Sequence, residues 1–424
     1  MTVIRVKDRA KEKLFGPTYS PIINTLLEVD RYKFSMLPIS MAHYDFFDVT
    51  FALKNRTTSV RLADEVDLSE LRSQLGRVHN LQITPEECDY LVKSDVFPED
   101  RSLDLMSIRL VEPEINETHD GQIDVRVSGR WKDVMLWETS VLTIINQLRT
   151  KGYVERHGID CRELIRKAEE RFLAKIPTLK KLTWSINQFG LRRRATAYME
   201  RRLTQIAKNE IPEILKAVSN VQVARELGVS SGGTIAHEIS MILYALRLWE
   251  GEDQARDSQY ETVRRMIQYY PYPNRLILPD AFGSNQFING MPEQMAIDTA
   301  GFRQDSGDPI EFGEMVIAMY KRFGIDPMTK RCVFSDGLTP EKMLEINQYF
   351  EGRIQGGFGW GTNMTNDTGI IKPLSLVMKP VRAADKDVVK LSDNVDKATG
   401  PRAAIEMAKR VFGYNVTYSK KCIY

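Results

Sequence analysis

The segment GFRQDSGDP, residues 301–309, combines two carboxylates, a hydroxyl, a flexible glycine and an arginine. Carboxylates such as Asp305 accept hydrogen bonds from vicinal sugar hydroxyls, while Arg303 suits an anion or a ring. The same residues also suit a turn followed by a helix, with Asp308 as its N-cap and Pro309 at its first position. The two interpretations are compatible, because one loop can both cap a helix and hold a ligand.

His237 follows Gly232, Gly233 and Thr234 and opens an apolar helical pattern. A histidine at a helix N-terminus, beside glycines that can bind phosphate, is placed to act as a nucleophile or acid–base group toward a phosphoryl donor. Glu238 is a weak partner for the ring, since adjacent helical residues do not face each other. A purely structural histidine is the alternative. No comparable setting surrounds the other histidines, His43, His79, His119 and His157.

The segment GFGWGTNMTND, residues 357–367, places three glycines before Thr362. Glycines let backbone N–H groups approach a phosphate closely, and the threonine hydroxyl adds a further donor. The spacing matches neither the P-loop nor the dinucleotide fingerprint. A phosphate cradle and a structural glycine-rich turn therefore both remain open.

Three consecutive arginines, residues 192–194, follow Phe189 in FGLRRR, and Tyr32 lies between Arg31 and Lys33. A guanidinium beside an aromatic plane suits recognition of a flat, negatively charged ring. The plain alternative is a solvated charge run with an aromatic on the surface.

The elements that must position these residues fall into two groups. Residues 48–53 and 123–129 alternate like strands, and residues 132–148 form a broadly apolar helix near which we place the first domain boundary. Beyond residue 160, amphipathic helices alternate with short apolar runs, which favours a parallel sheet or barrel with ligand sites in the loops after its strands. We expect an N-terminal α+β domain at 1–150, which residues 380–424 complete, and a barrel at 151–379. The runs are RLILP, RCVFSD and LSLVMKPV, and residues 1–20 read as a polar lead-in.

Composition excludes several classes of protein. The chain of 424 residues has a formal net charge of +2, too balanced for nucleic acid or an anionic membrane as the main partner. Its four cysteines show no CxxC spacing, so neither a disulfide framework nor a zinc site is expected, and no side chain is assigned as a metal ligand. With no signal peptide and no long apolar stretch, we expect a cytoplasmic protein.

Together and in this order, nine motifs resemble the nicotinate phosphoribosyltransferase family of type II phosphoribosyltransferases. The likeness runs from about residue 26 to residue 394. The resemblance implies an irregular α/β barrel with an α+β N-terminal domain, commonly as a homodimer with shared active sites. The motifs are LLEVDRYKFSM, FGLRRR, SNVQVARELG, GGTIAHE, PDAFGSNQF, GFRQDSGDP, FSDGL, GFGWGTNMTND and VVKLSDN.

The resemblance also implies a reaction: nicotinate and PRPP give nicotinate mononucleotide and pyrophosphate in NAD salvage, with Mg²⁺ and with ATP hydrolysis coupled through phosphorylated His237. Phe189 and Tyr32, the latter from the other subunit, would sandwich the pyridine ring. Ala217 and Val218 replace the family's usual Gly-Thr, which bears on the roles of Ser219 and Asn220. The remaining site residues implied are Arg192, Asp280, Arg303, Asp305, Ser335, Asp336, Gly337, Gly361 and Thr362.

Three rival functions remain. A nicotinamide phosphoribosyltransferase would need an acceptor for the amide N–H₂, whereas a carboxylate needs only cations or donors, which the three arginines favour. A nucleotide-binding sensor without catalysis would bind but not turn over. A sugar-phosphate isomerase would not depend on PRPP.

Overall fold

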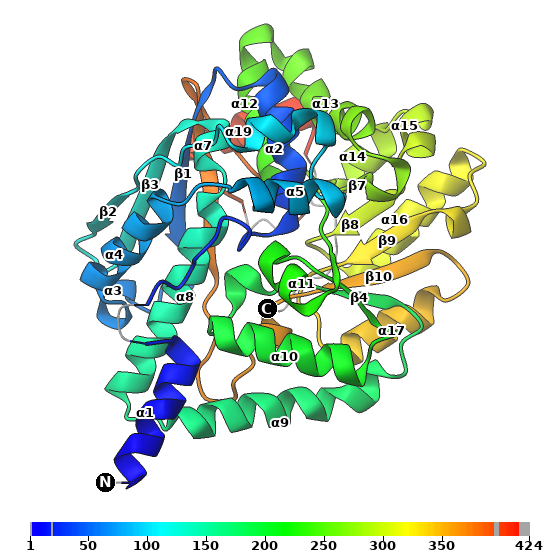
Figure 1. Cartoon of the computed structure of the whole chain (residues 1–424). Helices are drawn as coiled ribbons and strands as arrows, with labels where there is room; N and C mark the ends of the chain where they lie inside the picture. The colour runs from blue at the N-terminus through cyan, green and yellow to red at the C-terminus, as the bar shows by residue number, and fades with distance from the viewer. Residues whose placement is uncertain (1, 18–19, 394–397, 415–424) are drawn as a thin grey trace.

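The computed structural model describes residues 2–17, 20–393 and 398–414, and the side chains from residue 9 onward within them. Asn394 and Cys422 lie outside the described residues. The chain builds two sheets with helices around them (Figure 1). Among the described residues, none of the helices combines the length and apolar character that crossing a membrane requires.

The first sheet is antiparallel and has the order β12-β11-β1-β3-β2. Its central strand β1 pairs with β3 on one side and with β11 on the other, where Leu53 lies opposite Met378. The run LSLVMKPV was expected in the strand–helix alternation of the barrel, and this expectation is wrong: it forms β11 of the antiparallel sheet. The strands are β1 (Asp48–Asn55), β2 (Glu114–Glu117), β3 (Ile123–Arg130), β11 (Leu376–Ala383) and β12 (Lys386–Asp387).

The second sheet is parallel and has the order β6-β5-β4-β10-β9-β8-β7. It curls into a half-barrel, and no pairing joins its edge strands β6 and β7 among the described residues. This arrangement confirms the α/β class. The strands are β4 (Ser185–Gln188), β5 (Leu215–Val218), β6 (Ser230–Ser231), β7 (Leu276–Ile277), β8 (Gly301–Gln304), β9 (Arg331–Phe334) and β10 (Gln355–Trp360).

The long helix α8 (Trp137–Arg156) lies between the two sheets and is buried over most of its length (Figure 1). α12 (His237–Arg247) and α13 (Glu252–Tyr269) pack on each other, and α12 also contacts β11. Farther out on the parallel sheet lie α9 (Cys161–Leu179), α10 (Ala197–Glu210), α16 (Pro309–Arg322) and α17 (Pro340–Phe350). Further helices are α2 (Arg31–His43), α3 (Leu62–Glu65), α4 (Leu68–His79), α5 (Pro85–Lys93), α6 (Ser102–Leu105), α7 (Trp131–Val134), α11 (Val221–Leu227), α14 (Ser284–Gly290), α15 (Glu293–Asp298), α18 (Thr362–Thr365) and α19 (Arg402–Phe412).

The N-terminal segment is a helix, α1 (Thr2–Phe15), so the expected polar lead-in is wrong. Ala10 and Leu14 are buried in a small cluster with Leu164 and Met199, which lie on α9 and α10. Ala10 and Leu14 are four residues apart and therefore share one helical face. This spacing was the available signal for a helix, but the charged residues around it obscured the pattern.

Candidate active site

The segments that leave the parallel strands carry every residue that the sequence assigned to the site except Tyr32. Because parallel strands end at the same edge of a sheet, segments from seven strands converge there. They contribute Phe189 and Arg192 after β4, Ser219 and Asn220 after β5, His237 after β6, Asp280 after β7, Asp305 after β8, Ser335, Asp336 and Gly337 after β9, and Gly361 and Thr362 after β10, with Arg303 inside β8.

His237 opens α12 and is buried beside Asp280, whose Oδ1 lies 2.7 Å from the imidazole Nε2. Burial lowers the pKa of His237 to about 4, although Asp280 opposes the shift. Burial alone would raise the pKa of Asp280, but His237 and Lys390 hold it well below its usual value. A neutral imidazole beside an ionised carboxylate donates its Nε2–H, which leaves the lone pair on Nδ1. Nδ1 is therefore the nitrogen able to act as a nucleophile.

Asp280 is itself fixed from behind by two side chains. Ser306 Oγ donates to its Oδ2 at 2.6 Å, and Lys390 Nζ lies 3.4 Å from the same oxygen. Ser306 in turn contacts Ser392 Oγ at 3.2 Å. The segment around residue 390 therefore braces the histidine–aspartate pair, whereas Glu238 does not contact the imidazole and instead accepts hydrogen bonds from Lys33 and Trp131.

Asp305 lies beside this pair, with its Oδ2 3.9 Å from His237 Nε2. Its other oxygen lies 3.8 Å from Arg303 Nη2 and 3.1 Å from Ser335 Oγ. Burial works to raise the pKa of Asp305, but Arg303 and His237 hold it at about 2, so the carboxylate is ionised at neutral pH. Asp308 caps α16 by accepting from the backbone N–H groups of Ile310 and Glu311. The helix-cap interpretation of this loop is thus confirmed at Asp308, while Asp305 is turned to the cluster and its contact with a ligand stays a prediction.

Arg303 spans the site between the ionised cluster and an aromatic ring. Its guanidinium carbon lies 5.9 Å from the ring centre of Phe189, and its Nη2 donates to the carbonyl of Ile235. The buried Nε of Arg303 has no hydrogen-bond partner among the described residues. A cation beside a half-buried ring, with a donor left over, suits a flat anionic ligand.

The glycines of the segment 357–367 do not form a loop. Gly357 and Gly359 lie within β10, so the expected phosphate cradle or turn is wrong for them. A Cβ on Gly359 would lie 2.4 Å from the Phe189 ring and 3.0 Å from Ser335 Cβ. The glycine thus gives Phe189 its place in the site. Gly361 ends the strand and Thr362 begins α18, while Asp336 and Gly337 occupy the neighbouring turn after β9.

Tyr32 and Arg192 form a second group of charges and rings. Arg192 Cζ lies 5.2 Å from the ring centre of Tyr32, and its Nε lies 2.9 Å from Asp30 Oδ2. Ser219 Oγ donates to the other oxygen of Asp30 at 2.6 Å. Arg192 is close enough to Asp305 for its positive charge to be stabilised by that carboxylate, which connects the two groups.

Tyr32 is buried beside Arg192 of its own chain, and its contribution to the site of another subunit, which the family resemblance implied, stays a prediction. The arginine run is not solvated, because Arg194 is fully buried and binds Glu28 and Glu200. Asn220 is also buried; it caps α11 and donates to Glu200, so its amide has a structural use. Its contact with a ligand stays a prediction.

His237, Asp280 and Asp305 bring three potential metal-ligand atoms within 4.8 Å of one another. Mg²⁺ prefers oxygen and is usually bound by one or two carboxylates together with substrate phosphates. Asp280 already accepts hydrogen bonds from His237 and Ser306, while about a third of the Asp305 side chain is exposed. Asp305 is therefore the better placed of the two carboxylates for such an ion.

Sequence reasoning missed several buried ionisable residues around the site, because their partners are distant in the chain. Glu138 is a charged residue in an otherwise apolar helix, and this was the signal available in the sequence. A fully buried carboxylate requires a partner, so its position indicated a charged or donor group nearby. For Lys390 and Asp30 the signal was their position inside two of the nine motifs.

Comparison with models of known protein families gives two matches. The model of the nicotinate phosphoribosyltransferase (NAPRTase) family matches residues 184–416, more than half of the chain. The model of the NAPRTase N-terminal domain matches residues 27–146.

Solved structures show the same overall architecture. The crystal structure of nicotinate phosphoribosyltransferase from Porphyromonas gingivalis is 28% identical with a TM-score of 0.83, and the alignment covers 93% of this chain and 100% of that one. The enzyme of that name from Vibrio cholerae is 27% identical with a TM-score of 0.85, over 95% and 96% of the two chains.

Proposed function

This chain belongs to the nicotinate phosphoribosyltransferase family, and from that premise we propose that it joins nicotinate to the ribose of PRPP. The products are nicotinate mononucleotide and pyrophosphate, a step in NAD biosynthesis. The observation that carries the proposal is the arrangement around Arg303, which lies between the Phe189 ring and the ionised Asp305. A ring site and a sugar-hydroxyl acceptor thus adjoin each other.

In the proposed reaction the pyridine nitrogen attacks the anomeric carbon of PRPP, and the bond from that carbon to pyrophosphate breaks. The ring nitrogen is already a nucleophile, so the main task of the protein is orientation, which can supply about 7–11 kcal/mol of a barrier. Phe189 would hold the ring plane, and the guanidinium of Arg303 beside it would pair with the nicotinate carboxylate. Cations at the ring favour the acid over the amide.

We assign the ribose and phosphate groups to the segments after β8, β9 and β10. Asp305 would accept hydrogen bonds from the ribose hydroxyls, and Ser335, Asp336, Gly337, Gly361 and Thr362 would line the 5′-phosphate pocket. Mg²⁺ would be held by Asp305 together with pyrophosphate oxygens, where it neutralises the charge of the leaving group.

ATP coupling through His237 is the finer part of the proposal. A neutral imidazole with its lone pair on Nδ1 can attack the terminal phosphate of ATP and release ADP, and water would later take the phosphoryl group. Asp280 would stabilise the positive charge that develops on the ring. The buried His237–Asp280 pair supports this role.

The first experiment measures nicotinate mononucleotide formed from nicotinate, PRPP and Mg²⁺, with and without ATP, and with nicotinamide in parallel. Product from nicotinate with release of ADP is expected. Product from nicotinamide instead would support the rival transferase, and binding without product would support a sensor. Turnover of a sugar phosphate without PRPP would support an isomerase.

A homodimer with shared active sites and a cytoplasmic location complete the proposal. The buried, unpaired thiols of Cys88, Cys161 and Cys332 fit a reducing compartment. Light scattering at micromolar concentration tests the assembly, and a monomeric active enzyme would contradict it.

A further inference from the structure

One fully buried carboxylate near the ring side of the site, Glu138 of α8, meets four donors from three different segments. Lys33 Nζ and Tyr32 Oη lie 2.8 and 3.2 Å from its Oε2. Lys379 Nζ and Arg192 Nη1 lie 2.8 and 3.2 Å from its Oε1. Both oxygens of Glu138 are thus fully occupied by side chains of α2, β11 and the turn after β4.

The charges of this cluster depend on one another. Burial alone would raise the pKa of Glu138, but Lys33, Lys379 and Arg192 hold it well below its usual value. Burial also lowers the pKa of Lys379, and Glu138 opposes that shift. An isolated charge at this depth is unfavourable, so the cations require the carboxylate as much as it requires them.

Exposure divides the cluster into an inner and an outer part. The side chains of Glu138 and Lys33 are fully buried, whereas 28% of Arg192 and 14% of Lys379 are exposed. Glu138 therefore cannot reach a ligand itself. It can act only through the outer residues that it holds.

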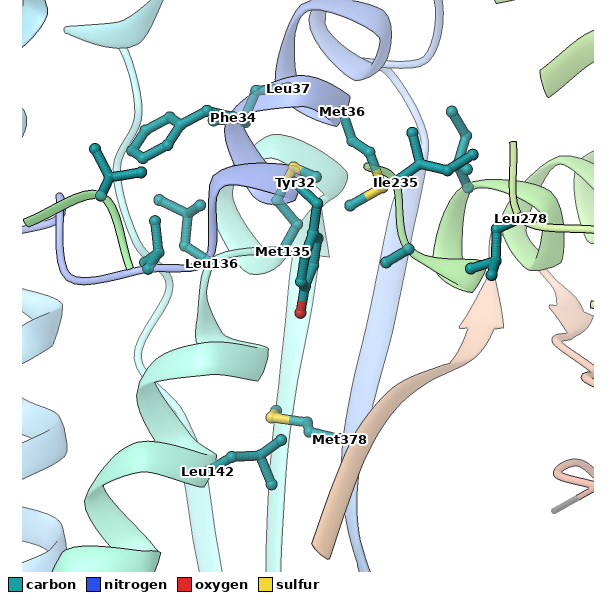
Figure 2. Packing of buried hydrophobic residues seen from close by; sticks show 14 of the residues in the cluster. Tyr32, Phe34, Met36, Leu37, Met135, Leu136, Leu142, Ile235, Leu278 and Met378 are labelled. Carbon is teal, nitrogen blue, oxygen red and sulfur yellow. The ribbon is translucent and has the colours of Figure 1, made fainter. Parts of the chain in front are cut away.

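Arg192 donates a hydrogen bond to Glu138 Oε1 through Nη1, while its Nε lies 2.9 Å from Asp30 Oδ2 in an ion pair without hydrogen-bond geometry. The hydrogen bond to Glu138 and the adjacent charge of Asp30 restrict the planar guanidinium, and the Tyr32 ring lies 5.2 Å from its carbon. In Figure 2 the hydroxyl of Tyr32 is turned away from Phe34, toward the side where Leu142 of α8 and Met378 of β11 lie. Glu138 and Lys379 lie on these same two elements, α8 and β11.

We propose that Glu138 is a positioning residue that orients Arg192, against which the Tyr32 ring lies, and thereby sets the affinity for the pyridine substrate. The inference rests on the proposed function, because it assigns these two side chains to the ring site. Because its own side chain is fully buried, Glu138 acts on the substrate only through Arg192.

The test compares steady-state kinetics of Glu138→Gln and Glu138→Asp with the wild type. Glu138→Asp keeps the charge but shortens the side chain, so it should fold even where the glutamine variant does not. For each variant that folds, we expect the KM for nicotinate to rise about tenfold, while the KM for PRPP changes by less than about twofold. A purely structural role would reduce the active fraction and leave both KM values in place.

Glu65→Gln is the matched control. It also breaks a largely buried ion pair to α8, where Glu65 Oε2 lies 2.6 Å from Arg149 Nε, but it leaves the Glu138 cluster intact. We expect it to lower the melting temperature without raising the KM for nicotinate. Equal effects of Glu65→Gln and Glu138→Asp on that KM, or no effect of either Glu138 variant, would overturn the inference while leaving the proposed function standing.

A second measurement separates the inference from the proposed function. Phenylglyoxal modifies accessible arginines, and peptide mass spectrometry reports its rate at Arg192. Loss of the Glu138 hydrogen bond should speed modification of Arg192 several-fold in whichever variant folds, whether or not nicotinate is a substrate. An unchanged rate would show that Glu138 does not hold Arg192.

Discussion

His237 combines two properties that a nucleophilic histidine needs. Burial keeps the imidazole neutral, and Asp280 fixes which nitrogen carries the proton. Asp280 follows a different strand from His237, so the sequence around His237 does not show which nitrogen carries the proton. Ser306 and Lys390 then fix Asp280, which limits rotation of the pair.

His237→Ala should abolish nicotinate-stimulated ATP hydrolysis and ATP-driven activation, because it removes the group that accepts the phosphoryl. We expect a loss of at least about a hundredfold in ADP release, the scale on which loss of an essential acid–base or nucleophilic group acts. Circular dichroism should report a folded protein. His119→Ala, at an exposed position, is the control and should keep full coupling. Full coupling in His237→Ala would contradict the phosphohistidine role.

The pH dependence of ATP hydrolysis should follow the lowered pKa of His237. The neutral ring is the reactive form, so His237 should not change the rate between neutral pH and the region of its own pKa. The rate should then fall as pH decreases through about 4, not through the ordinary value of 6.5. A profile of ADP release with saturating substrates measures this, and return to pH 7 before assay controls for unfolding. An inflection near 6.5 would show that His237 is not buried and neutral.

The residue types in the loop 301–309 were enough to predict its helix cap, because a helix cap is a local feature. Asp308 and Pro309 begin α16 as expected. The environment of Asp305 was not predictable, since it depends on His237 and on Ser335 after another strand.

At the level of this loop, Asp305→Asn and Asp308→Ala should separate ligand binding from capping. Asp305→Asn removes a charge from the cluster and should reduce PRPP use by at least about tenfold with little change in stability. Asp308→Ala removes an N-cap and should cost about 1 kcal/mol of unfolding free energy. Urea unfolding and PRPP kinetics of both variants measure this. Equal loss of stability and activity in Asp305→Asn would favour a purely structural loop.

Strand β10 shows why a glycine-rich pattern misled the sequence interpretation. Glycines indicate close approach of some group, but they do not say whether it is a phosphate or a side chain. At Gly356 that group is Trp184, and at Gly359 it is Phe189. The two partners are the residues immediately before and after β4, which only the folded sheet brings next to β10.

Gly359→Ala should displace Phe189, since the new methyl would lie 2.4 Å from its ring. We expect an overpacking cost of about 1–3 kcal/mol in unfolding free energy and a higher KM for nicotinate. Gly357→Ala is the matched control on the same strand, because the nearest atom to its added methyl is 3.6 Å away. Similar kinetics for both variants would show that Phe189 does not bind the ring.

At the scale of the whole molecule, the α/β class followed from the strand–helix alternation, but the sheet membership of β11 did not. Its apolar pattern suits either sheet, and its partner β1 lies more than 300 residues earlier in the chain. Only the register between the two strands, which places Leu53 opposite Met378, assigns it to the antiparallel sheet. The same limit applies to α1. The residues of α1 do not reveal that α9 and α10 are the helices on which it packs.

Because β11 completes the first sheet, the chain returns to its N-terminal part after building the parallel sheet. One continuous core of buried residues includes Phe51 and Met378 of the first sheet together with Phe334 and Phe358 of the second. A shared core opposes independent unfolding of its parts, since opening one sheet exposes apolar surface of the other. We therefore expect the two sheets to unfold together.

Met378→Ala tests this coupling. The side chain is fully buried, and its loss should reduce the unfolding free energy by about 2–5 kcal/mol. Hydrogen exchange followed by mass spectrometry should show equal loss of protection in peptides from β3 and β9, which report the two sheets. Met407→Ala, at an exposed position on α19, should change neither. If β3 lost protection while β9 kept it, the sheets would be separate folding units, and the position of Lys379 at the Glu138 cluster would depend on docking between them.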